Sequence, residues 1–103
     1  MECQNLQQVR QEIDRIDDEI IKKIAERSQY VLQASKFKKN EEGVKAPARV
    51  EQVIQKVRTK AETYGAPPDL VEAVYREMIS QFINLEMDKF KQQQQPPSQL
   101  PSQ

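Results

Sequence analysis

One stretch without proline or glycine decides the fold: residues 5–40 read NLQQVRQEIDRIDDEIIKKIAERSQYVLQASKFKKN. Its apolar side chains recur mostly at steps of three or four, which is the spacing of one face of an α-helix. This apolar stripe consists of Leu6, Val9, Ile13, Ile16, Ile20, Ile24, Val31 and Ala34. Asn5 stands just before the stripe and belongs to the residue types that cap helix N-termini. The stretch therefore predicts one long amphipathic helix.

Two shorter helices are expected after a break at residues 40–46. Pro47 suits the first turn of a helix, and Gly65 is the residue type that ends one. Pro67 and Pro68 then form a stiff turn before a third helix, which is rich in apolar and aromatic residues. The pattern predicts an all-α fold of three helices, one long and two shorter.

The domain organisation follows from length and composition. We expect one helical domain over residues 1–91 and a disordered tail of Gln, Pro and Ser over residues 92–103, because the tail cannot support a core. A helix of about 35 residues is roughly 52 Å long, whereas a compact domain of this size has a radius of gyration of about 13 Å. Since two shorter helices cannot cover such a length, we expect an intertwined helical homodimer.

The composition excludes several kinds of chemistry. The absence of histidine removes Ser–His and Cys–His catalysis and most zinc sites, and Cys3 alone forms neither an intrachain disulfide nor a multi-cysteine metal site. Sixteen basic residues balance sixteen acidic ones, so nothing attracts nucleic acid or an anionic membrane overall. We expect no metal and no cofactor. The lone cysteine and the lack of a signal peptide or membrane-spanning run favour a cytoplasmic protein.

Charged residues interrupt the apolar faces. Arg27 and Lys38 are eleven residues apart, which at about 100° per residue puts both on one line of a continuous helix. Arg10 lies beside the same stripe, and Glu86 lies on the apolar line of the third helix. A buried charge is costly unless it is paired. Two interpretations follow: an internal polar pocket, or long cations that reach out from the stripe edge and pair with Glu86 as a salt bridge.

The chain resembles the all-helical chorismate mutase family (chorismate mutase type II) from about Leu6 to Phe90. The pieces that carry the resemblance are VRQEIDRIDDEIIKKIAERSQYV (9–31), ASKFK (34–38), APARVEQVI (46–54) and GAPPDLVEAVYREMISQFINLE (65–86). The family pattern has an arginine, an IDxID-like run, an AER-type arginine and a lysine eleven residues later. Arg10, Arg27 and Lys38 match it with the spacing kept.

The resemblance implies a dimer with two equivalent sites for a dicarboxylate, either chorismate or isochorismate. Arg10 would reach the site of the partner subunit, and Arg27 and Lys38 would hold the carboxylates within one subunit. Lys38 would also donate toward the ether oxygen of the substrate. Arg49 matches a substrate-binding arginine at the start of the second helix. Glu86 matches a position that is Gln or Glu in the family and contacts the same oxygen.

Two activities remain open. Where many mutases have acidic residues that contact the ring hydroxyl of the substrate, this chain has Ala46 and Val50. The APxRV and SKFK forms are similar to the isochorismate pyruvate lyase branch, whereas Glu86 resembles some mutases more than the glutamine of the lyase. The resemblance therefore implies a chorismate mutase, with isochorismate pyruvate lyase as the alternative. A non-catalytic helical dimerisation module is the third interpretation.

Overall fold

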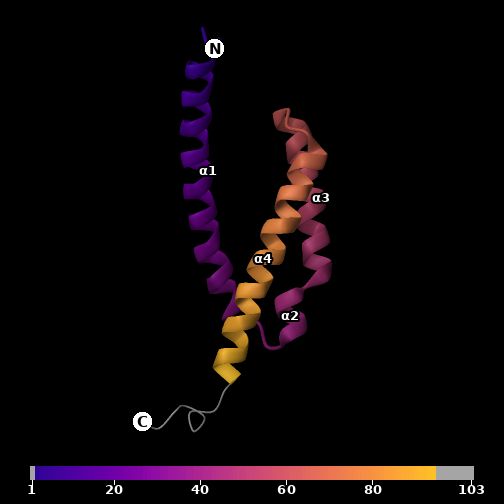
Figure 1. Ribbon diagram of the computed structural model, residues 1–103. Coiled ribbons are helices and arrows are strands. Elements are labelled where there is room, and N and C mark those ends of the chain that lie inside the picture. The colour runs from indigo at the N-terminus through magenta and orange to yellow at the C-terminus, as the bar shows by residue number, and fades with distance from the viewer. Residues whose placement is uncertain (1, 95–103) are drawn as a thin grey trace, which may run out of the picture. The chain divides into compact units, whose positions relative to one another are not determined.

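The computed structural model describes residues 2–94, and every regular element in that part of the chain is a helix. In order, the helices are α1 (Leu6–Ser35), α2 (Glu41–Lys45), α3 (Pro47–Tyr64) and α4 (Pro68–Gln94), as Figure 1 shows. This confirms the predicted all-α class and the three principal helices. The chain divides after Gln33 into two compact units, and each unit is described by itself.

Helix α1 is amphipathic along its whole length. The side chain of Asn5 caps it, because its Oδ1 accepts a hydrogen bond from the backbone N–H of Gln8 at 2.9 Å. No residue of α1 is buried. The exposed fraction lies between 39% and 61% for six stripe members, which are Leu6, Val9, Ile13, Ile16, Ile20 and Ile24. A helix with such an apolar stripe gains most of its stability when another surface covers the stripe.

The long helix ends at Ser35, earlier than predicted. The chain tightens there, since the backbone N–H groups of Phe37 and Lys38 bond to the carbonyls three residues before them, at 3.0 and 3.2 Å. Asn40 sets a limit to the helix, because its backbone is extended (φ −154°, ψ 175°) to cap the next helix. A residue in that conformation cannot continue the preceding helix.

Helix α2 occupies part of the segment that was predicted to be a plain break. Asn40 Oδ1 accepts the N–H of Gly43 at 2.8 Å, and Val44 is 2% exposed. The helix ends at Ala46, which adopts the left-handed conformation (φ 37°) and also precedes Pro47. The short helix thus joins directly onto the first turn of α3, where Pro47 stands as predicted.

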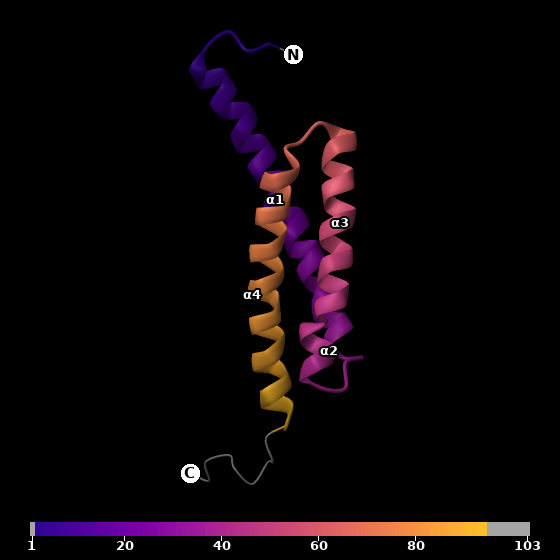
Figure 2. The same ribbon diagram turned by 90° about the vertical axis from the view of Figure 1, so that its right-hand side faces the viewer.

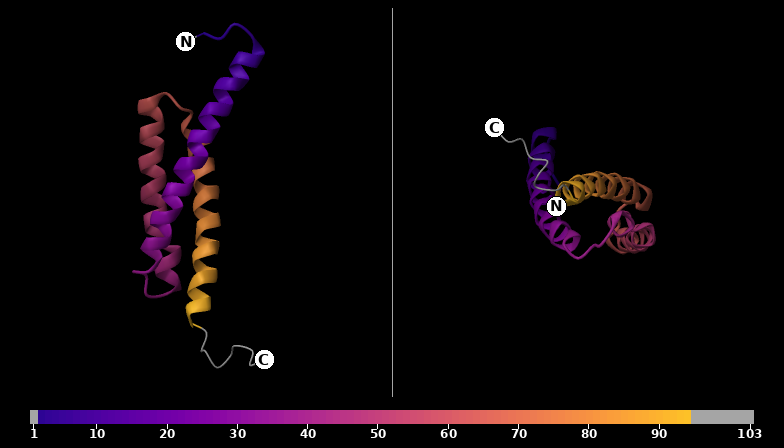
Figure 3. Two further views of the ribbon diagram at one scale, coloured as in Figure 1. Left: turned by 90° about the vertical axis from the view of Figure 1, so that its left-hand side faces the viewer. Right: turned by 90° about the horizontal axis from the view of Figure 1, so that it is seen from below.

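Helices α3 and α4 run side by side in opposite directions, and the views in Figures 2 and 3 show the same pairing. Gly65 ends α3 in the left-handed conformation (φ 77°), which confirms the predicted cap, and Pro68 is the first residue of α4. The helices bury Ile54 (0% exposed) and Ala61 (4% exposed). Full burial of one such isoleucine is worth about 1.5–3 kcal/mol, so Ile54 is a main anchor of this hairpin.

The C-terminal helix continues to Gln94, past the domain boundary expected at Lys91. The remainder of the predicted tail, residues 95–103, lies outside the described residues. Among the helices of the described part, none is both long enough and apolar enough to cross a membrane.

Candidate functional site

The structure brings two of the predicted site residues together. Lys38 Nζ lies 3.1 Å from Glu86 Oε2, in a hydrogen-bonded ion pair between the segment that follows α1 and the C-terminal half of α4. The side chain of Glu86 is only 4% exposed and that of Lys38 is 26% exposed. The pair therefore joins a buried carboxylate to a cation that still touches solvent.

Glu86 is unusual for its helix. Along the described part of α4 it is the one fully buried residue, and it is the one buried charged residue in the described chain. The apolar residues on its line of the helix, among them Ile79 and Ile83, are only partly covered. A carboxylate in such a place needs a partner, because an unpaired buried charge costs several kcal/mol. Lys38 is that partner.

Lys38 reaches Glu86 from a position that helical geometry did not predict. The expectation that Arg27 and Lys38 share one line of a continuous helix was wrong, because α1 stops at Ser35. Lys38 instead lies in the connection between α1 and α2. Both Lys38 and Arg27 are partly buried.

Arg49 lies in the first turn of α3, directly after Pro47 and Ala48. It is exposed, and it forms no ion pair with any residue that the structure describes. Because Lys38, Glu86 and Arg49 all belong to the same unit, this part of the chain carries both an ion pair and an uncommitted guanidinium. A guanidinium of this kind is well suited to grip a carboxylate with two hydrogen bonds.

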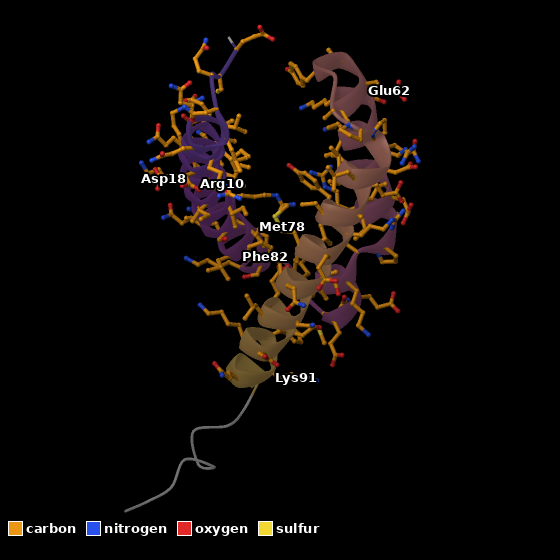
Figure 4. The ribbon with its side chains drawn as sticks, turned by 45° about the horizontal axis from the view of Figure 1, so that its top comes forward. Arg10, Asp18, Glu62, Met78, Phe82 and Lys91 are labelled. Atoms are coloured by element: carbon orange, nitrogen blue, oxygen red, sulfur yellow. The ribbon has the colours of Figure 1, made fainter. Side chains whose placement is uncertain are left out.

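Arg10 and Arg27 both lie on α1, within the other unit. Arg10 is exposed near the start of the helix, and Figure 4 shows it projecting from α1 together with Asp18. Arg27 is partly buried near the C-terminal part of the helix. The roles assigned to these two arginines by resemblance therefore stay predictions.

A charge network between α3 and α4 escaped the sequence analysis. Arg76 forms a fork with Glu51 (2.9 and 3.0 Å) and also bonds to Glu72 at 2.7 Å. Arg58 bonds to Glu72 at 2.7 Å and to Asp69 at 3.0 Å. Only the spacing of four residues between Glu72 and Arg76 could have revealed part of it in advance. The network ties the two helices of the hairpin together.

These contacts shift the titration of every group that takes a central part in the network. Hydrogen bonds from Arg76 and then from Arg58 hold the pKa of Glu72 below its ordinary value. The hydrogen bonds from Arg76 likewise lower the pKa of Glu51. The pKa of Arg58 is raised by its hydrogen bonds to Asp69 and Glu72, and that of Arg76 by those to Glu51 and Glu72. All of these groups are therefore charged near neutral pH.

The site is suited to stabilising an anion by charge and hydrogen bonds. The part of the chain that the structure describes contains no group of three His, Cys, Asp or Glu residues that could hold a metal ion. What it offers instead is a lysine fixed by a buried carboxylate. An ammonium group has three donors, so Lys38 can keep its bond to Glu86 while it donates to a bound oxygen.

An all-α fold with a lysine paired to a buried glutamate, together with arginines suited to carboxylates, is typical of a small helical protein that can bind an organic anion. The model of the chorismate mutase type II family matches residues 9–87, so this chain belongs to that family. The match covers nearly all of α1, the whole of α2 and α3 and most of α4, and it includes every predicted site residue.

Two relatives give the family match more detail. The chain is 32% identical over 91 residues to an isochorismate pyruvate lyase of Pseudomonas aeruginosa, covering 88% of this chain and 90% of the relative. It is 33% identical over 87 residues to a bifunctional chorismate mutase/prephenate dehydratase of Aquifex aeolicus, covering 81% of this chain. The chain spans only 24% of the length of that second relative.

Proposed function

We propose that this protein is a chorismate mutase, which converts chorismate to prephenate without a cofactor. The observation that carries the proposal is the ion pair of Lys38 Nζ with the buried Glu86 carboxylate at 3.1 Å. The ion pair holds a hydrogen-bond-donating cation in place, and the family resemblance implies that Lys38 donates toward the ether oxygen of the substrate. Family membership supports an activity of this type.

The reaction needs little chemistry from the protein. In chorismate, the bond between the ring and the ether oxygen breaks while a carbon–carbon bond forms between the enolpyruvyl group and the ring. No atom is gained or lost, and no nucleophile is required. The protein has to hold the conformer in which the reacting carbons meet. It also has to stabilise the negative charge that grows on the ether oxygen.

The cationic residues have separate tasks in this proposal. Arg27, Arg49 and the Arg10 of a second copy hold the carboxylates and thereby select the conformer. Lys38 stays within the site and donates to the ether oxygen. Because this assignment requires an arginine from each of two subunits, the proposal includes a homodimer. The exposed apolar stripe on α1 supports such assembly, since dimerisation would cover it.

Glu86 can help the same oxygen only in its protonated form. An ionised carboxylate beside the ether oxygen would repel the growing charge, whereas a protonated one can donate a hydrogen bond. Since the Glu86 side chain is only 4% exposed, bulk water does not compete for its hydrogen bonds. We therefore propose that Glu86 is a second donor to the ether oxygen.

Isochorismate pyruvate lyase is the second candidate function. The relative that this chain matches over 90% of its length has that name. In that reaction the same ether bond breaks, a ring hydrogen moves to the enolpyruvyl group, and salicylate and pyruvate are formed. The demands on the protein are identical in kind, so the same cations would serve. Glu86 favours the mutase, since the resemblance to the lyase branch implies glutamine at its position.

A product analysis tests both candidates directly. The purified protein is incubated separately with chorismate and with isochorismate, and the products are separated and identified. Prephenate from chorismate is the expected result, and salicylate with pyruvate from isochorismate would establish the lyase instead. If neither substrate is converted, the chain is a non-catalytic dimerisation module, and both enzymatic proposals are wrong.

A further inference from the structure

The backbone around Lys38 belongs to neither neighbouring helix, although its side chain reaches a fixed target. Lys38 follows the last turn of α1 and precedes Asn40, which begins α2. A lysine side chain has about 2 kcal/mol of rotamer entropy to lose when it is held in one place. Its bond to Glu86 therefore depends on how firmly the backbone of Lys38 is held.

Asn40 organises the backbone that follows. Its side-chain Oδ1 accepts the N–H of Gly43 at 2.8 Å, and its carbonyl accepts the N–H of Val44 at 3.2 Å. Helix α2 has five residues, and helices this short do not persist in water without outside support. The Asn40 cap is consequently a large share of what keeps α2 helical.

Helix α2 is the element that links Lys38 to α4. It packs against α4, the helix that carries Glu86, and its residue Val44 is 2% exposed. On its other side α2 lies against Lys38. A methyl group added at Gly43 would stand 3.6 Å from Lys38 Cβ and 3.9 Å from its Cα, which is ordinary contact distance. One short helix therefore lies close to Lys38 and packs against the helix that carries its partner.

We propose that Asn40 is a positioning residue for Lys38. By capping α2, Asn40 keeps the backbone of Lys38 at the place from which Nζ meets Glu86 and points its remaining donors toward the substrate. The inference rests on the proposed function, because it assumes that Lys38 acts on the substrate. Asn40 itself touches no reacting atom, and it acts entirely through α2.

The first test separates the cap from the residue type. Asn40→Ala removes the acceptor, so kcat is expected to fall about fivefold, the factor that corresponds to the loss of a typical N-cap. Asn40→Asp and Asn40→Ser keep an acceptor, and their kcat is expected to stay within about twofold of the wild type. The matched control is Gly65→Ala, which strains a left-handed helix end at the opposite end of α3, with no atom within 4 Å of the added methyl group. It should lower Tm without lowering kcat.

The second test asks whether Asn40 acts through Lys38. In a Lys38→Ala background, Asn40→Ala should cause no further loss of kcat, because there is no ammonium left to position. In the opposite direction, Gly43→Ala favours the helix and fits the available space, so it should restore part of the kcat lost in Asn40→Ala. The Gly43→Ala background also provides a folded version of the variant if Asn40→Ala alone is unstable.

The outcomes are distinct. A wild-type protein that converts neither chorismate nor isochorismate overturns the proposed function and this inference together. A wild-type protein that is active, with Asn40→Ala equally active, overturns this inference alone. The inference is also wrong if Asn40→Ala lowers kcat by an equal factor with and without Lys38, since the effect would then not pass through the lysine.

Discussion

The hairpin of α3 and α4 buries Ile54 and Ala61 and ties its helices together with two arginines, whereas α1 buries none of its residues. Both regions are amphipathic, and both are rich in charge. The two regions differ in whether another helix covers their apolar residues. In Figures 1 and 2, α3 and α4 lie side by side, and Ile54 and Ala61 are buried there.

The comparison shows which part of the chain can be complete alone. The unit that contains the hairpin also contains Lys38, so the core, the charge network and the Lys38–Glu86 pair all belong to one unit. Helix α1 has an exposed apolar stripe and two of the predicted substrate-binding residues, Arg10 and Arg27. In the proposed homodimer, a second copy of the chain would cover the apolar stripe of α1. It would also provide a substrate site to which those arginines could contribute. Substitutions in each region can test this difference. The largest change in oligomeric state and activity is expected from substitutions on α1.

The strongest test breaks the stripe on α1. Ile16→Asp places a charge on it, and two-fold symmetry would bury that charge twice in a homodimer. At about 3–5 kcal/mol for each unpaired buried charge, the dimer dissociation constant should rise by at least about four orders of magnitude. Sedimentation velocity at micromolar concentration should then show monomers. An enzyme assay of the same sample should show little activity.

The control for this variant adds the same charge elsewhere on α1. Gln29 is exposed and faces away from the stripe, so Gln29→Asp should leave the oligomeric state unchanged. Circular dichroism should show that the helical hairpin persists in both variants. A fully active Ile16→Asp monomer would contradict the idea that α1 needs a second copy.

The next largest effect is expected from Lys38, which belongs to the same unit as the hairpin. Lys38→Ala removes the proposed donor to the ether oxygen, and loss of one such donor costs about a hundred- to a thousandfold in kcat. The dimer should stay intact, because Lys38 is not part of the apolar stripe. Steady-state kinetics measure the loss, and Lys36→Ala, an exposed lysine two residues earlier, serves as control. Equal activity of both variants would remove Lys38 from the site.

Arg27 provides a test on the α1 side that leaves the charge unchanged. Arg27→Lys keeps the positive charge but loses the planar fork that binds a carboxylate with two hydrogen bonds. The loss of one charge-assisted hydrogen bond should lower kcat/KM by about ten- to a hundredfold. Kinetics with the preferred substrate measure it. If Arg27→Lys has the same kcat/KM as the wild type, a point charge is sufficient. The proposed two-bond contact between Arg27 and a carboxylate would then be wrong.

A pair of substitutions sharpens the role of Glu86. Glu86→Gln keeps a hydrogen-bond donor beside the ether oxygen but loses the ion pair with Lys38. If donation is the role of Glu86, kcat of Glu86→Gln should stay within about twofold of the wild type, whereas Glu86→Ala should lower kcat about tenfold. Glu77→Gln, an exposed position on the same helix, should leave kcat unchanged. An equal loss of kcat in Glu86→Gln and Glu86→Ala would mean that the ionised Glu86 serves only to orient Lys38.

The sequence predicted the helices well and the site partly. Periodicity and the residue types at Asn5, Pro47 and Gly65 predicted the helix ends that the structure confirms, because caps are local and each depends on a few neighbours. The end of α1 was wrong because the apolar and cationic spacing continued past Ser35. Spacing carries no information on the tight turn at Phe37 and Lys38, or on the extended backbone with which Asn40 begins a new helix.

The contacts between helices were the least predictable part. Glu86 was recognised as a charge on an apolar line, and a salt bridge to one of the stripe cations was one of two open interpretations. The structure identifies Lys38 as the partner, through a connection whose course no periodicity describes. The forked bond of Arg76 to Glu51 joins residues 25 positions apart, and a contact of that kind arises only from the packing of α3 on α4.

The smallest effect tests whether the hairpin is held by charge. The pKa values of Glu51 and Glu72 are lowered in the folded chain by their bonds to Arg76 and Arg58. A carboxyl group with a lowered pKa adds stability at pH values above its ordinary value of 4.5, and this stability is lost as the pH falls through the lowered value. Arg76→Ala should therefore reduce Tm at pH 7 by a few degrees and have a smaller effect at pH 3.

Arg15 supplies the comparison on α1, since it bonds to Glu12 and Glu19 of its own helix at 3.1 Å in both cases. Exposed pairs within one helix contribute little, so Arg15→Ala should change Tm less than Arg76→Ala does at pH 7. High salt should narrow the gap between the two variants, because screening weakens exposed ion pairs. A Tm loss in Arg76→Ala that is equally large at pH 3 would mean that the arginine stabilises the hairpin through its alkyl chain. In that case the two regions would differ only in how their apolar faces are covered.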